Sequence, residues 1–135
     1  MKKKQIIIGV ILLISIVSMI ILIVNNNKKR VEEKKQSTIE NGTVQKDIEI
    51  ENITFSDVKL KYENGIITLT SKVKGKKNIE SVTVKIIFLD ETGNEIKNTV
   101  QVVENITTKE KVFTTGFVGN YEAIKQVKFE VVKEK

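Results

Sequence analysis

The chain has 135 residues, carries a formal net charge of +6 at pH 7, and contains no cysteine, histidine or proline. At this length it holds one modest domain, with room for a targeting or anchoring segment beside it. The missing residue types exclude thiol and histidine catalysis, disulfides and zinc fingers. Only carboxylates, Lys, Ser, Thr and two Tyr remain for chemistry.

An uncharged apolar run extends from Ile6 to Val24, after a short basic tail over residues 1–5. As a helix this run spans roughly 28 Å, close to the ~30 Å hydrocarbon core of a bilayer. Its two serines, Ser15 and Ser18, are expected to bond back to helix carbonyls. We therefore predict a transmembrane segment over residues 6–24, whose partner is the lipid bilayer.

A cleaved signal peptide is the alternative interpretation of this run, since Lys2, Lys3 and Lys4 supply the positive start that such peptides share. The run is longer than a usual signal peptide core, and no small-residue cleavage site follows it, so an uncleaved signal anchor is favoured. Both flanks of the apolar run carry basic residues, so counts of these residues do not decide which flank lies in the cytoplasm. The short N-terminal tail favours an orientation with the C-terminal part outside the cytoplasm.

The basic excess lies on the two flanks of the apolar run, whereas residues 47–135 contain equal numbers of basic and acidic residues. Flanking bases can meet anionic lipid headgroups, and nothing in the distribution requires nucleic acid, which we do not expect as a partner. Residues 25–46 combine many charges with few apolar residues. They predict a flexible charged stalk, with a break in the helix at Asn25–Asn27.

From Asp47 onward apolar and polar residues alternate, as in half-buried strands. Asn64-Gly65 lies between two alternating runs and predicts a tight hairpin. The stretch from Ile79 to Asp90 is the most apolar, which indicates a central strand. Short strands with turn signals roughly every 8–12 residues predict an all-β domain over residues 47–135, a small antiparallel sandwich of about seven strands behind one transmembrane helix.

The run from Val73 to Asn94 resembles the centre of the bacterial FxLYD domains. It has their polar turn, here at Gly75–Asn78, and a long apolar strand that ends in Asp90, followed by a glycine and another strand. Glu110–Phe113 matches their acidic residue before an aromatic strand. The resemblance covers roughly residues 50–132. It implies an immunoglobulin-like β-sandwich, commonly exported and associated with the bacterial membrane or wall, with no shared catalytic residues.

A basic strip of four lysines surrounds the second predicted turn: Lys72, Lys74, Lys76 and Lys77. One hypothesis is that it binds an anionic polymer or headgroup. The alternative is that lysines on an edge strand block pairing with another sheet.

Two aromatic residues, Phe117 and Tyr121, lie in a glycine-flanked segment near the C-terminus. If exposed, they form a candidate contact with an envelope protein, because aromatic side chains dominate interface energies. The alternative is that they close the end of the sandwich.

Three acids cluster between Asp90 and Glu95, but without the alternating spacing of a calcium loop. A turn with a left-handed glycine explains them, so we predict no metal and no cofactor. The glycosylation-type motifs at Asn41, Asn52 and Asn105 carry little meaning in a bacterium.

Together these features predict a single-pass membrane protein with a non-enzymatic binding, adhesion or scaffolding role at the bacterial cell envelope. An accessory or regulatory subunit of a membrane complex is the second hypothesis. An enzyme is not expected, because no pair of carboxylates is placed to share acid–base chemistry.

Overall fold

A computed structural model describes the backbone of residues 2–134 and the side chains of residues 9–31 and 33–132. Met1 and the side chains of the predicted basic tail and of Ile6–Ile8 lie outside these described residues. The chain divides into two compact units, and the boundary between them in the sequence lies between residues 33 and 34. The predicted boundary at residue 47 therefore lies inside the second unit.

The long helix α1 (Lys2–Lys35) accounts for the first unit, and its last two residues belong to the second. From Gly9 to Lys35 it is long and apolar enough to cross a membrane, a property that signal sequences share. Ser15 donates to the carbonyl of Leu12 and Ser18 to that of Ile14, both at 2.9 Å, as predicted. The expected break at Asn25–Asn27 is absent, because the helical hydrogen bonding continues through them to Lys35.

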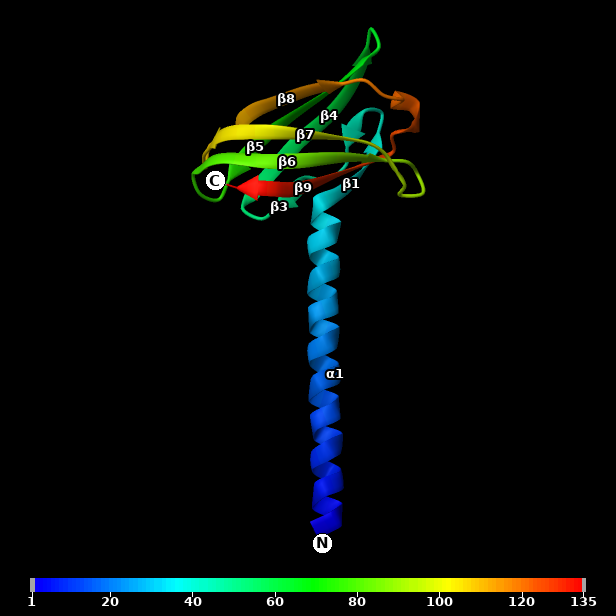
Figure 1. Cartoon of the computed structure of the whole chain (residues 1–135), viewed down its shortest axis with the longest axis vertical. Helices are drawn as coiled ribbons and strands as arrows, with labels where there is room; N and C mark the ends of the chain where they lie inside the picture. The colour runs from blue at the N-terminus through cyan, green and yellow to red at the C-terminus, as the bar shows by residue number, and fades with distance from the viewer. Residues whose placement is uncertain (1, 135) are drawn as a thin grey trace. The chain divides into compact units, whose positions relative to one another are not determined.

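The second unit is built from nine strands and one short 3₁₀ helix (Figure 1). In chain order these are β1 (Gln36–Glu40), β2 (Thr43–Val44), β3 (Ile48–Ile50), β4 (Ile53–Glu63), β5 (Ile66–Gly75), β6 (Ile79–Leu89), β7 (Glu95–Ile106), β8 (Lys111–Phe117), η1 (Tyr121–Ala123) and β9 (Gln126–Glu134).

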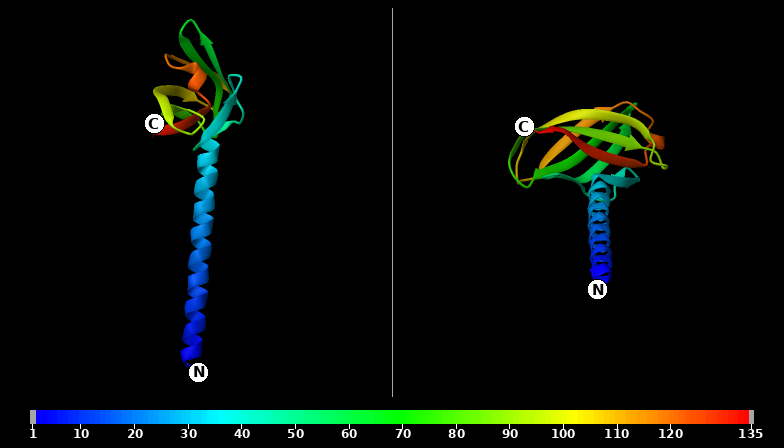
Figure 2. Two further views of the ribbon diagram at one scale, coloured as in Figure 1. Left: turned by 90° about the vertical axis from the view of Figure 1, so that its right-hand side faces the viewer. Right: turned by 60° about the horizontal axis from the view of Figure 1, so that its bottom comes forward.

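All strand pairs are antiparallel, and the strands form one sheet in the order β7-β6-β9-β1-β2-β4-β5-β8, with β3 added to β4. The sheet curves over on itself into a barrel-like shape (Figure 2). The all-β class is confirmed, but the predicted count of about seven strands is too low. β1 pairs with both β9 and β2, and so links what would otherwise be two separate sheets.

The predicted stalk differs from the structure between residues 36 and 44, which form β1 and β2. Ser37 and Val44 are buried, and Ile39 packs against the core. These two strands are short and mostly polar, so their amino-acid composition resembles that of a linker. Their pairing with β9 and β4 supplies the hydrogen bonds that hold them in the sheet.

The core lies between the two halves of the curved sheet and contains the inward residues of nearly every strand. Phe55 of β4 and Phe129 of β9 meet edge to face across it, with ring centroids 4.7 Å apart. β6 lies between β7 and β9 as predicted for a central strand. Its Ile87 and Leu89, on the other face from Phe88, are also largely buried.

The hairpin between β4 and β5 confirms the prediction at Asn64-Gly65. Glu63 pairs with Ile66, which leaves a two-residue loop. Asn64 and Gly65 both have positive φ, 52° and 81°. This is the backbone conformation that favours Asn-Gly in tight hairpins.

Candidate functional site

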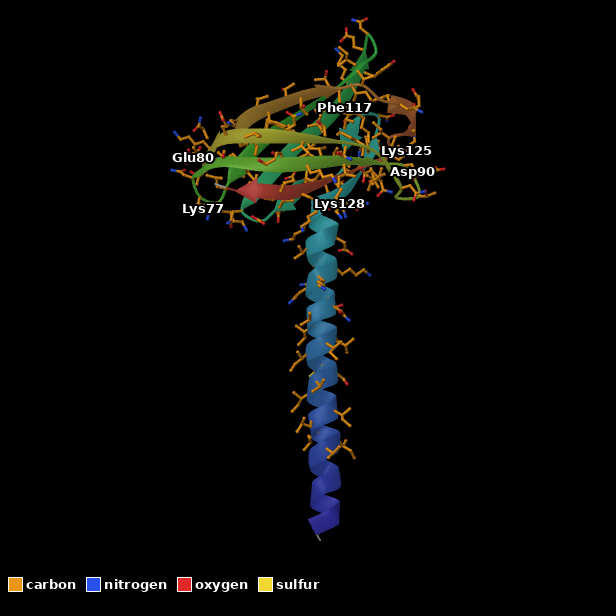
Figure 3. The ribbon with its side chains drawn as sticks, viewed as in Figure 1. Lys77, Glu80, Asp90, Phe117, Lys125 and Lys128 are labelled. Carbon is orange, nitrogen blue, oxygen red and sulfur yellow. The ribbon has the colours of Figure 1, made fainter. Side chains whose placement is uncertain are left out.

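The predicted basic strip divides between a strand and a loop. Lys72 and Lys74 lie on the outer side of β5, which pairs with β4 on one side and β8 on the other. Because β5 is an interior strand, protection of a sheet edge does not explain these lysines. Lys76 and Lys77 follow in the loop between β5 and β6. Figure 3 labels Lys77 and, at the start of β6, Glu80 at this end of the domain.

The β4–β5 register adds two lysines that the sequence analysis missed. Lys59 pairs with Thr70 and Lys61 with Thr68, on the same outer side as Lys72 and Lys74. Lys59 and Lys61 alternate regularly with apolar residues in the sequence, but only the pairing of β4 with β5 shows that they lie beside Lys72 and Lys74. The four lysines, Lys59, Lys61, Lys72 and Lys74, are called the lysine face below.

Acidic residues offset part of the charge of the lysine face. Asp57, in the bulge, approaches Lys72 to 3.0 Å, and Glu63 approaches Lys61 to 3.0 Å. The hydrogen bond from Lys72 lowers the pKa of Asp57, and the same contact raises the pKa of Lys72. Both groups are exposed to solvent, so the pair contributes little to stability.

Phe117 is a core residue and does not form an exposed contact. Only 8% of its surface is accessible, and its ring stacks on Phe88 with centroids 4.3 Å apart. Exposure, on which the hypothesis of a partner contact depended, is therefore absent at Phe117, and its burial agrees with the alternative that it closes the end of the domain.

Tyr121, in η1, is partly exposed and stacks on Tyr62 of β4, with ring centroids 5.7 Å apart and an angle of 17° between the planes. It is therefore the one of the two predicted aromatic residues that remains accessible. Tyr121 also lines a surface cavity of about 280 Å³. The other residues that line this cavity are Ile39, Asn41, Gly42, Leu60, Glu122, Ile124 and Lys125.

This cavity, called the η1 cavity below, combines apolar and polar walls. Leu60 and Ile124 are buried and Ile39 is partly buried, whereas Asn41, Glu122 and Lys125 are exposed. The side chains of Asn41, Glu122 and Lys125 make no hydrogen bond or ion pair with the described residues, and neither does the hydroxyl of Tyr121. Their bonding capacity is left for solvent or a ligand.

The β1–β2 hairpin brings Asn41 and Gly42 to the η1 cavity. Both have positive φ, 51° and 74°, and Glu40 pairs with Thr43 across them. A Cβ on Gly42 would lie 2.5 Å from the carbonyl oxygen of Leu60 and 3.0 Å from the Tyr121 hydroxyl. Asn41-Gly42 is the same hairpin dipeptide as Asn64-Gly65, and this signal could have revealed the hairpin.

The acidic segment from Asp90 forms the turn that the sequence predicts. Asp90 Oδ1 accepts hydrogen bonds from the Thr92 amide at 2.9 Å, the Thr92 hydroxyl at 2.7 Å and the Asn94 amide at 2.9 Å. The hydrogen bond from the Thr92 hydroxyl is the main cause that lowers the pKa of Asp90. Among the described residues, no group of three or more acids lies close enough together to hold a metal ion.

No family model matches the chain, and the search of curated proteins gives no match. Among solved structures, the chain is similar to the trimeric lipoprotein SadB of Salmonella enterica, with 9% identity and a TM-score of 0.60, over 88% of this chain and 70% of that one. It is also similar to cj0090 of Campylobacter jejuni, with 14% identity and a TM-score of 0.42, over 60% of this chain and 85% of that one.

A DUF1425 family member from Shewanella sp. pv-4 has 13% identity and a TM-score of 0.43, over 71% of this chain and 86% of that one. The SadB match extends beyond the β-rich unit, since it covers more residues than that unit contains. At 9% identity it shows a shared fold. The chain therefore has the fold of a small bacterial β domain.

Proposed function

We propose that this chain is a single-pass membrane protein whose β domain lies outside the bacterial cytoplasm and binds a component of the cell envelope without catalysing a reaction. The observation that carries the proposal is the order of the two units. A helix able to span a bilayer ends at Lys35, and the first strand of the β domain begins at the next residue.

Two similarities support this placement. The fold is shared with a bacterial lipoprotein, SadB, and lipoproteins are envelope proteins. Residues 73–94 resemble the FxLYD domains, and this resemblance implies an immunoglobulin-like module that is commonly exported. The bilayer is the partner of Ile6 to Val24, and the lysine face offers a surface for an envelope protein or an anionic polymer.

Protease access tests the topology. Cells stripped of their wall carry the full chain with an epitope tag after Lys135, and protease is added before or after lysis. Loss of the tagged domain in intact cells supports the proposal. A domain that is digested only after lysis contradicts it, provided that a cytoplasmic control protein behaves in the same way.

An accessory subunit of a membrane complex is the alternative, and exposed valines favour it. Val100 and Val102 of the edge strand β7 are 52% and 57% exposed, and Val132 of β9 is 58% exposed. Apolar groups clustered on a surface often mark contacts between proteins.

Crosslinking in native membranes separates the two functions. A discrete crosslinked species that weakens in the double variant Val100→Thr with Val102→Thr supports the subunit function. The control is Val112→Thr, which changes a valine on β8 that is still more exposed, at 69%. An unchanged pattern in both variants contradicts a role for this surface.

A further inference from the structure

We propose that the η1 cavity binds one sugar ring of an envelope glycan. This inference deepens the proposed function and depends on it for the source of the ligand. The cavity is lined by the apolar residues Ile39, Leu60 and Ile124 together with exposed Asn41, Glu122 and Lys125. Small-molecule sites share this combination of an apolar surface and a few polar groups that fix orientation.

The charges around the cavity favour a neutral ligand with many hydroxyl groups. Glu122 is an acceptor, Lys125 is a donor, and the Asn41 amide and Tyr121 hydroxyl each donate and accept. Glu122 and Lys125 carry opposite formal charges, so the residues that line the cavity have no net charge. A sugar hydroxyl donates and accepts at the same atom, and so can satisfy each of these groups.

The cavity walls also match the amphipathic shape of a sugar ring. Its C–H face can pack on Leu60, Ile124 and the Tyr121 ring, while its hydroxyls face the polar side chains. The stack on Tyr62 holds the Tyr121 ring in one orientation before a ligand arrives. This preorganisation lowers the entropic cost of binding.

Gly42 and the volume of the cavity restrict the ligand to a small unit. Because Gly42 has no side chain, the backbone of the β1–β2 hairpin reaches within contact of Leu60 and the Tyr121 hydroxyl. The cavity of about 280 Å³ lies at the lower limit of small-molecule sites. One ring, rather than a longer segment of a chain, fits this space.

Tyrosine fluorescence gives a direct measurement of binding. The chain contains no tryptophan and two tyrosines: Tyr121, which lines the cavity, and Tyr62, which stacks on Tyr121. The full chain is held in a polyoxyethylene detergent, because detergents with glucose or maltose headgroups would compete. Glucose and N-acetylglucosamine are titrated up to millimolar concentrations, and tyrosine emission is followed.

We expect a saturable change in emission with at least one of the two sugars. Glu122→Gln removes a charged acceptor, so we expect the dissociation constant of this variant for the sugar to be about tenfold higher, or more, than that of the parent chain. The control Glu91→Gln changes an exposed acid in another loop and should leave the dissociation constant unchanged. Far-UV circular dichroism checks that each variant is folded.

Three results would overturn the inference: no saturable change with either sugar, an equal effect of Glu122→Gln and Glu91→Gln, or saturation with glycine but not with sugar. The last result would assign the cavity to a zwitterion held between Glu122 and Lys125. Because binding is measured in detergent, it is independent of topology. A cytoplasmic domain that binds sugar would contradict the proposed function alone.

Discussion

Phe88 of β6 and Phe117 at the end of β8 stack with ring centroids 4.3 Å apart and an angle of 26° between their planes. β6 and β8 do not pair with each other through the backbone in the described part of the sheet. The two rings therefore join strands that lie far apart in the sheet order, and they do so inside the core.

Phe117→Ala is expected to destabilise the β domain by about 3–5 kcal/mol, because it removes a buried ring and leaves a cavity. Urea unfolding of the full chain in detergent, followed by circular dichroism, measures the change. The neighbouring variant Val118→Ala, at a residue that is 67% exposed, should stay within about 0.5 kcal/mol of the parent. Equal stabilities of the two variants would show that Phe117 is not a core residue.

Gly42→Ala and Gly65→Ala separate backbone strain from steric overlap. Both glycines have positive φ, which costs alanine about 1–2 kcal/mol. A Cβ at Gly65 meets nothing within 4 Å, whereas at Gly42 it overlaps the carbonyl of Leu60. Gly42→Ala is therefore expected to cost at least about 1 kcal/mol more than Gly65→Ala in the same unfolding measurement. The reverse order would contradict the close approach.

Asp90 is expected to make the domain less stable in acid. Its pKa in the folded chain is lowered below the ordinary value of 3.8, chiefly by the hydrogen bond from Thr92. The folded state thus binds the proton less readily than the unfolded state. The stabilisation is complete above the unfolded pKa and is lost as pH falls through the lowered folded pKa.

Thermal unfolding at a series of pH values from neutral to strongly acidic measures this loss. Asp90→Asn should lower the unfolding midpoint at neutral pH and flatten its decrease in acid. Glu91→Gln removes an acid from the same turn and should leave the acid dependence attributed to Asp90 in place. If both variants retain the full decrease, the hydrogen bonds to Asp90 are not its cause.

The boundary of the β domain can be tested with two fragments. Residues 34–135 include β1 and β2, whereas residues 47–135 leave the edges of β9 and β4 without these partners. We expect cooperative unfolding of the longer fragment and not of the shorter one, measured by circular dichroism. A cooperative transition of the shorter fragment would show that β1 and β2 are dispensable.

Local signals predicted the parts of the fold that depend on neighbouring residues. Asn64-Gly65 fixed a hairpin because two positive φ values are required there. The apolar stretch of β6 identified a central strand. In contrast, β1 is short and polar, and it belongs to the sheet because β9, distant in sequence, pairs with it. No local pattern reports such a partner.

The candidate site was predicted less well, for the same physical reason. Tyr121 was identified, but the cavity beside it also needs the β1–β2 hairpin and β4, which come from distant parts of the chain. The lysine face needed the register of β4 against β5, and the bulge near Ser56 alters that register. Phe117 was left open between a surface contact and the end of the core, because sequence alone does not show whether an aromatic side chain at a strand end points inward.

The pairing of β1 with β9 has a consequence for biosynthesis. The first strand of the domain cannot find its partner until the ribosome has made the last one, and contacts between such distant segments form slowly. α1 precedes every strand in the chain, so it is synthesised before the β domain can close. An unfolded chain is the form that a protein-conducting channel can thread, so late closure of the domain is compatible with the location outside the cytoplasm that we propose.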